Sequence, residues 1–206
     1  MDIAVNLVES YLRLNGYLTL SEMEVQKKTK SGLYETLTDV DIVALRFPGQ
    51  IYATDPHDKD DCRMLLIDDD VLELESETID VIIGEVKQGE AVFNPGLTRH
   101  EVLHTVLQRV EWIYATELDG VIGQLTESGV SLLPSRSGGL VRTRLVAFGR
   151  ADVSNLNTIS LSHIVEAMVR FMDEFDDVLR PAQFKEPAQA FLRLLAKTGF
   201  SVTKEG

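Results

Sequence analysis

The segment DVIIGEVK, residues 80–87, restricts the fold more than any other part of the chain. Its apolar run, residues 81–83, lacks the alternation of a half-exposed strand. A short continuous run of this kind is typical of a strand that is buried on both faces of a sheet. Two charged residues, Glu85 and Lys87, close the run. The segment therefore predicts a central strand that carries an acid and a base at its end.

Hydrophobic periodicity and turn signals predict the elements around this strand. Helices are predicted at four places: residues 3–14, 98–116, 159–175 and 181–198. Strands are predicted at four places: residues 17–25, 33–47, 80–87 and 140–148, the first two joined by a basic turn. Residues 118–139 show no clear pattern except a flexible turn at their end. This order predicts a mixed α/β protein with one domain over residues 1–206.

The acidity of the chain is concentrated in one stretch. The net charge is −13, but residues 55–80 hold eleven acids and two bases, which is −9 and leaves −4 for the rest. We interpret residues 48–79 as a solvated or partly disordered excursion, with a short apolar run at 64–67 that is a candidate strand. The alternative is a segment that mimics nucleic acid or gates a cleft. A local acidic stretch, unlike a uniformly acidic surface, leaves nucleic-acid binding open.

The sequence shows no sign of a membrane span or of disulfide chemistry. No apolar run approaches the ~18 residues that a membrane span needs. The N-terminus carries Asp2 and Glu9 and lacks the basic region of a signal peptide. Cys62 is the only cysteine, which excludes an intrachain disulfide and a cysteine-based zinc site. We therefore expect a cytoplasmic protein with no membrane partner.

A second acid stands at the start of another apolar run. Asp41 precedes residues 42–45, and charges in such strands are costly unless they are paired or liganded. Glu85 and Lys87 share one face of their strand because side chains alternate with a period of two. If the two strands are neighbours, two carboxylates and an amine meet. Such a set can bind Mg²⁺ and activate water on a phosphate, and the plainer alternative is a structural ion pair.

These residues, together with Glu9 in the first predicted helix, resemble the PD-(D/E)xK nuclease superfamily. The stretches NLVESYLRLNGY, TDVDIVAL and VIIGEVKQG carry the resemblance, which spans residues 3 to about 148. It is nearest to archaeal Holliday-junction resolvases and related restriction-endonuclease-like enzymes. Two features depart from the pattern: Val40 stands where the family name has proline, and 44 positions separate Asp41 from Glu85.

The resemblance implies a restriction-endonuclease-like α/β core of one helix, three strands, a helix and a strand, here with extra C-terminal helices. It implies that Asp41 and Glu85 hold Mg²⁺ or Mn²⁺, that Lys87 serves the attacking water, and that Glu9 adds a ligand or orients one. The implied activity is hydrolysis of phosphodiester bonds in DNA, with branched and single-stranded DNA among the substrates. The alternative within this fold is an inactive module for binding or assembly. Asp39 is either a further ligand or, as we favour, a turn residue.

The E-x-K pattern is weak by itself, and its context gives it most of its specificity. Of the eight lysines, Lys87 alone has an acid two positions before it. Basic residues in the predicted hairpin turn and in the strand at 140–148 are candidate DNA contacts: Lys27, Lys28, Lys30, Arg142 and Arg144. The helices after residue 159 serve either a homodimer or the cover of the sheet.

The pentapeptide HEVLH, residues 100–104, supports a different class of function. His100 and His104 share one helix face and can hold zinc, with Glu101 as general base of a metalloprotease. A catalytic zinc needs a third protein ligand. Glu111 lies about 10 Å further along the same helix, too far to close such a site. The remaining candidates for the third ligand are downstream acids: Glu117, Asp119 and Glu127.

Overall fold

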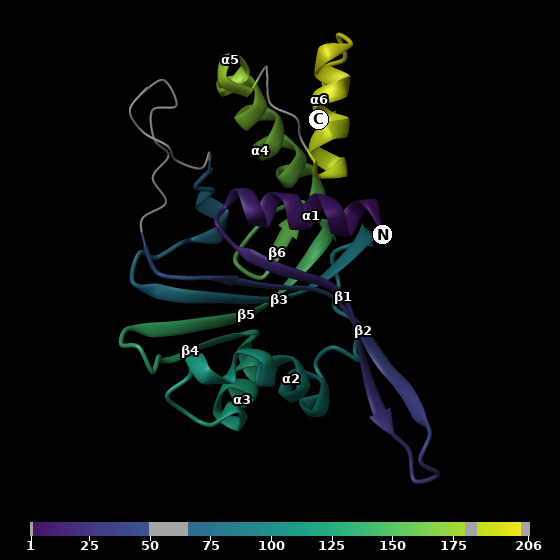
Figure 1. The fold of residues 1–206 in the computed structure, drawn as a ribbon, viewed down its shortest axis with the longest axis vertical. Coiled ribbons are helices and arrows are strands. Elements are labelled where there is room, and N and C mark those ends of the chain that lie inside the picture. Colours follow the sequence, from purple (N-terminus) through teal and green to yellow (C-terminus); the bar gives the residue numbers. More distant parts are fainter. Residues whose placement is uncertain (1, 50–65, 180–184, 203–206) are drawn as a thin grey trace.

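A mixed six-stranded sheet forms the middle layer of the computed structural model, which describes residues 2–49, 66–179 and 185–202 (Figure 1). Three strands form an antiparallel meander: β1 (Leu18–Lys28), β2 (Tyr34–Arg46) and β3 (Thr78–Glu90). The next long strand, β5 (Leu140–Arg150), is parallel to β3. Two short strands share the outer edge of β5, antiparallel β4 (Val130–Pro134) and parallel β6 (Thr158–Ser160).

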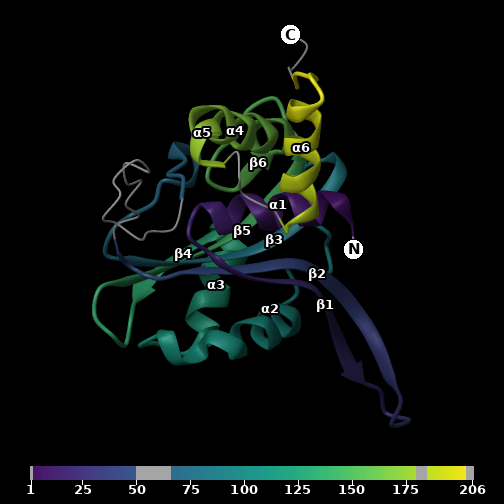
Figure 2. The ribbon, with the colours of Figure 1, turned by 45° about the horizontal axis from the view of Figure 1, so that its top comes forward.

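Helices cover both faces of this sheet (Figures 1 and 2). One face carries four helices: α1 (Ile3–Leu14), α4 (Leu161–Glu174), α5 (Asp176–Leu179) and α6 (Pro187–Lys197). The other face carries α2 (His100–Leu107), the 3-10 turn η2 (Gln108–Ile113) and α3 (Leu118–Ser128). A further 3-10 turn, η1 (Asp70–Leu72), precedes β3. The predicted α/β class, with an N-terminal helix and C-terminal helices, is confirmed.

Two apolar cores lie on opposite sides of β3. Val81 and Ile83 belong to the core under α2 and α3, whereas Ile82 and Val86 belong to the core under α1 and α4. The strand is buried from Thr78 through Val86, which confirms the prediction of a strand covered on both faces. Burial of both faces explains why its apolar run is continuous.

The hairpin of β1 and β2 extends well beyond the sheet. Only the end of β2 from Ile42 to Arg46 pairs with β3, while β1 pairs with β2 along almost its whole length. We call residues 26–36 the hairpin arm; it begins at a bulge after Val25, and its residues are exposed apart from half-buried Thr29. In both ribbon views the arm projects away from the helices (Figures 1 and 2).

Several predicted boundaries differ from the structure. The helix predicted over 98–116 ends at Leu107 and continues as the 3-10 turn η2. The last helix begins at Pro187, with that proline in its first turn, rather than at Pro181, which lies outside the described residues. Of the candidate strand at 64–67, the first two residues are also outside them, and the other two form no strand.

The segment 118–139, which gave no clear pattern, contains α3 and β4. Gly120 and Gly123 lower the helix propensity of α3. Burial of Val121, Ile122 and Leu125 against the core under the sheet outweighs that cost. In the described part of the chain, no helix combines the length and apolar character needed to cross a membrane.

Candidate functional site

Asp41 and Glu85 lie where β2 and β3 separate. Pairing of the two strands stops at Ile42 and Gly84, so Asp41 and Glu85 occupy the next opposed positions. The backbone N–H of Val86 donates to Oδ2 of Asp41 at 2.7 Å. A side-chain carboxylate thus takes a hydrogen bond that a backbone carbonyl would take in a continuing ladder. We call this place the strand fork. It brings together Asp41 and Glu85, the two predicted metal ligands.

Lys87 completes the group that the sequence predicted at the fork. Its Nζ donates to Oε1 of Glu85. Glu85 is 2% exposed, and its second oxygen, Oε2, is buried without a hydrogen-bond partner. The side chain of Lys87 is 41% exposed, so the group opens to solvent on the side of the amine. A buried, unpaired carboxylate oxygen is costly, and a cation at the fork would relieve that cost.

The electrostatics of the fork disfavour two bare carboxylates. Burial raises the pKa of Asp41; the Val86 N–H and Lys87 oppose the shift, and Asp39 adds to it. Burial also raises the pKa of Glu85, where Lys87 opposes the shift and Asp41 adds to it. The hydrogen bond to Glu85 in turn raises the pKa of Lys87. Both acids therefore ionise less readily than free carboxyl groups, and a bound cation would reverse this.

The donor set at the fork fits Mg²⁺ or Mn²⁺. Over the residues that the structure describes, no group of three or more His, Cys, Asp or Glu side chains is placed to hold a metal ion. Mg²⁺ does not require such a cage, because it commonly binds through one or two carboxylates and completes its shell with water and phosphate oxygens. Asp41 and the unpaired oxygen of Glu85 would supply the two hard oxygen ligands.

Glu9, the fourth predicted site residue, has partners of its own on α1 and β1. It is 5% exposed on α1, and its Oε1 accepts from Arg13 at 2.6 Å and from Thr19 at 2.9 Å. The hydroxyl of Ser21 also donates to it at 3.3 Å, and Ser21 pairs across the hairpin with Ile42, next to Asp41. Glu9 therefore ties α1 to β1, which pairs with β2 on the edge opposite the fork, and none of its hydrogen bonds in the described part of the chain reaches the two acids of the fork.

The three predicted lysine contacts lie on the hairpin arm. Lys28 and Lys30 are exposed, and Lys27 forms an ion pair with Glu101 at the start of α2. The acid that the HEVLH motif would use as a general base is thus engaged by the arm.

The expectation that Arg142 and Arg144 contact DNA is wrong for this structure. Arg142 is 7% exposed and Arg144 is fully buried. Nε of Arg142 donates to Oδ1 of Asp80 at 2.6 Å, and Arg144 donates to Oδ2 at 2.8 Å. The hydroxyl of Tyr17 donates to the same carboxylate. Burial would raise the pKa of Asp80, but the two arginines hold it below its usual range.

This buried cluster also fixes nearby backbone. Arg142 donates to the carbonyl oxygens of Leu72 and Glu73, each at 2.9 Å, which attaches η1 to β5. Arg144 donates to the carbonyl oxygen of Leu156 at 2.9 Å. Sequence reasoning missed the cluster. The available signal was the cost of two arginines within an apolar strand, which requires a buried acid as partner.

The two histidines of HEVLH form no zinc site with the described residues. Their rings stack with centroids 6.1 Å apart, and Nε2 of His100 lies 3.0 Å from Oδ1 of Asp119. Asp119 was one of the candidates for a third ligand, but both side chains of this pair are mostly exposed. The arrangement is that of a surface hydrogen bond beside α3.

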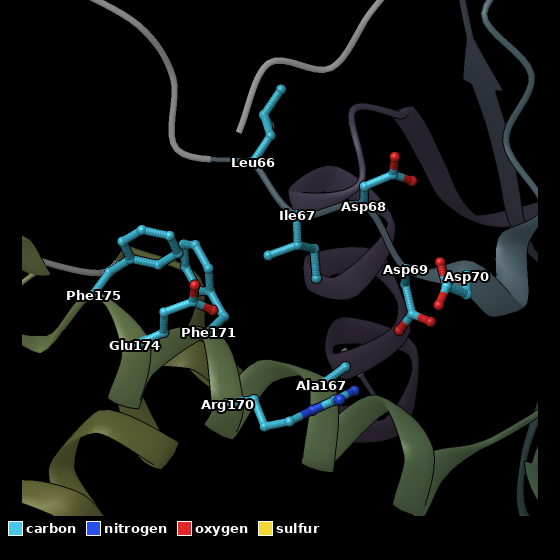
Figure 3. Close-up of a pocket in the computed structure, with 10 residues that line it drawn as sticks. All are labelled: Leu66, Ile67, Asp68, Asp69, Asp70, Ala167, Arg170, Phe171, Glu174 and Phe175. Atoms are coloured by element: carbon cyan, nitrogen blue, oxygen red, sulfur yellow. The ribbon is translucent and has the colours of Figure 1, made fainter. Parts of the chain in front are cut away.

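A separate cavity of about 340 Å³ lies between α4 and the stretch before β3 (Figure 3). Three consecutive aspartates, residues 68–70, line one side, and Arg170 and two phenylalanines line the other. Asp69 is held at the rim by Nε2 of His163 at 2.9 Å. None of the predicted site residues lines this cavity.

Comparison with known proteins finds no match: no family model fits the sequence, no curated protein is similar to it, and no solved structure matches it. Any statement of function therefore depends on the strand fork and its surroundings.

Proposed function

We propose that this protein is a Mg²⁺-dependent nuclease that hydrolyses phosphodiester bonds in DNA. The observation that carries the proposal is the meeting of Asp41, Glu85 and Lys87 at the strand fork. The order of elements supports it. A helix, a three-strand meander, helices and a strand parallel to β3 follow one another as in the restriction-endonuclease-like fold that the sequence resembles.

Each fork residue has a role that follows from its contacts. Asp41, fixed by the Val86 N–H, and Glu85, with its unpaired Oε2, would hold the metal ion. When bound, Mg²⁺ offsets charge on the phosphate and lowers the pKa of bound water. Lys87 holds its proton beside Glu85, so its Nζ is suited to orient water or to donate to a phosphate oxygen. Glu9 acts as a positioning residue through Ser21.

The second candidate is a nuclease-fold module that lacks catalysis and serves binding or assembly. The chain has a net charge of −13, and two of its arginines are buried against Asp80. DNA-binding proteins commonly show a basic face, so the acidic balance of this chain favours a role in binding or assembly over DNA cleavage. The same fork would then bind a cation without hydrolysis.

A cleavage assay tests the proposal. Plasmid, branched and single-stranded DNA are incubated with Mg²⁺ or Mn²⁺ and the wild-type protein, Asp41→Asn, Lys87→Ala or Lys197→Ala. We expect cleavage by the wild type and by the control Lys197→Ala, whose residue is exposed on α6. Removal of Lys87 should slow cleavage by about 10²–10⁴-fold, the usual worth of a positioned acid or base. A wild-type protein that cuts no substrate would overturn the nuclease and favour the binding module.

A further inference from the structure

The hairpin arm concentrates exposed positive charge in an acidic protein. The arm, residues 26–36, contains three lysines and one acid, Glu35, whereas the whole chain carries −13. Lys27 is partly neutralised by Glu101, which leaves Lys28 and Lys30 to face solvent. Such a patch attracts polyanions.

The arm also exposes apolar side chains. Leu33 is 71% and Tyr34 is 67% exposed, and both lie at the turn beside the lysines. A two-stranded ribbon on its own is marginally stable in water, so an extended one with apolar residues at its tip is suited to a partner surface. The partner must accept positive charge and offer apolar contacts.

We propose that the hairpin arm docks in the major groove of duplex DNA beside the strand fork; the placement of the cut relative to the arm rests on the proposed nuclease function. The major groove of B-form DNA admits a two-stranded β-ribbon. Lys28 and Lys30 contact phosphates, and Leu33 and Tyr34 lie against base edges, where thymine methyl groups offer apolar contact. The deep, narrow major groove of an RNA duplex does not admit the ribbon.

The geometry sets a reach. Tyr34 pairs with Lys28 and stands seven residues before Asp41 on the same strand. At a rise of ~3.3 Å per residue, Tyr34 lies at most about 23 Å from Asp41 at the fork. That span corresponds to about seven base-pair steps of 3.4 Å. A duplex with about seven base pairs on the arm side of the cleaved bond is therefore long enough to reach from the fork to Tyr34.

Binding at different salt concentrations tests the docking. Fluorescence anisotropy in EDTA follows binding of a 30-base-pair DNA duplex to the wild type, to Lys28→Ala/Lys30→Ala and to the control Lys197→Ala. Loss of two phosphate contacts should reduce the slope of log K against log salt by about 1.8. Between 50 and 200 mM salt, the affinity of the double variant then falls about twelve-fold less than that of the wild type. An unchanged slope would overturn the docking.

Substrate form and length test the groove and the reach. The wild type should bind the DNA duplex more tightly than an RNA duplex or a single strand of equal length. Equal affinity for all three would overturn groove docking. Cleavage by the wild type should become more efficient as the duplex on one side of the cut lengthens, up to about seven base pairs, whereas the double variant should show no such dependence on length.

The outcomes separate the docking from the nuclease proposal. If the wild type cuts DNA and the double variant keeps the wild-type slope of log K against log salt, the nuclease proposal is supported and the docking is overturned. If the wild type cuts no DNA but the double variant has a smaller slope of log K against log salt, the docking is supported and the nuclease proposal is overturned. If Leu33→Ser/Tyr34→Ser dissociates a wild-type dimer in sedimentation without changing the slope, the arm is an interface between copies and the docking is overturned.

Discussion

The carboxylate of Asp41 accepts the backbone N–H of Val86 across the strand fork at 2.7 Å. This bond holds an acid in place where the ladder between β2 and β3 ends, opposite Glu85. The position of the acid therefore depends on backbone rather than on flexible side chains. It also means that substitution of Asp41 removes both a proposed metal ligand and the hydrogen-bond partner of the Val86 backbone.

Glu85→Gln should stabilise the protein in EDTA at neutral pH and abolish its stabilisation by Mg²⁺. The wild-type acid is buried beside Asp41, and its raised pKa means that ionisation costs folding energy. For the wild type, thermal unfolding with increasing MgCl₂ should show a gain of about 1.4 kcal/mol at ten times the Kd. If the variant is stabilised by Mg²⁺ as much as the wild type is, Glu85 is not a ligand of the metal.

The same pKa shifts predict how metal binding depends on pH. Asp41 and Glu85 both have raised pKa values, so they take up protons at higher pH than free carboxyl groups. The metal needs the ionised forms, so Mg²⁺ affinity should fall as pH decreases toward that raised range. Without metal, the stability of the protein depends on pH in the opposite direction. The stability that these two groups contribute is lost as pH rises from the ordinary pKa of a carboxyl group to the raised pKa. Titration calorimetry at several pH values measures the Mg²⁺ affinity, and unfolding at the same pH values measures the stability of the metal-free protein.

Lys87→Met should tighten metal binding while it slows cleavage. Lys87 occupies Oε1 of Glu85, so it competes with a cation for that carboxylate. The change also leaves the buried Glu85 carboxylate without its amine, so the metal-free protein should lose stability at neutral pH. Calorimetry with Mg²⁺ measures the affinity, and the cleavage assay measures the rate. If both affinity and rate fall together, Lys87 supports the shape of the fork instead.

Asp80→Asn should destabilise the protein by about 3–5 kcal/mol, because removal of one partner leaves buried charge uncompensated. The pKa of Asp80 is held low, so its contribution is present above the ordinary pKa of an aspartate and is lost as pH falls through the lowered value. Urea unfolding at neutral and acidic pH measures both effects. Asp152→Asn is the matched control, because Asp152 is exposed and should change stability little. Equal stability of both variants would contradict a structural role for the cluster.

His104→Ala should leave metal content, stability and DNA cleavage unchanged. The two histidines of HEVLH have no third metal ligand among the described residues, and Glu101 is paired with Lys27. Elemental analysis of protein purified without chelators checks the metal content. If the wild type contains stoichiometric zinc and the variant does not, the result would support the zinc metalloprotease alternative.

Local patterns were sufficient to predict the first helix, the hairpin and the central strand, because their periodicity follows directly from burial. The acids and the lysine of the fork were predictable for the same reason: charges stood at the ends of apolar runs. The role of Arg142 and Arg144 was not predictable from their own strand, because alternation shows only that they share a face. Whether that face meets solvent or Asp80 depends on the pairing of β3 with β5, which joins residues about sixty positions apart.

The cluster around Asp80 also determines which pairings of the sheet are excluded. Asp80 stands opposite Arg142, so a shift of β3 by one residue would turn the acid toward the apolar core under α2 and α3. The same shift would turn Glu85 away from Asp41. Replacing the three charges with apolar residues would then be tolerated or even stabilising, but mispaired sheets would no longer carry a large penalty. The cluster thereby favours the strand register in which Asp41 and Glu85 stand opposite each other, although it does not touch the fork.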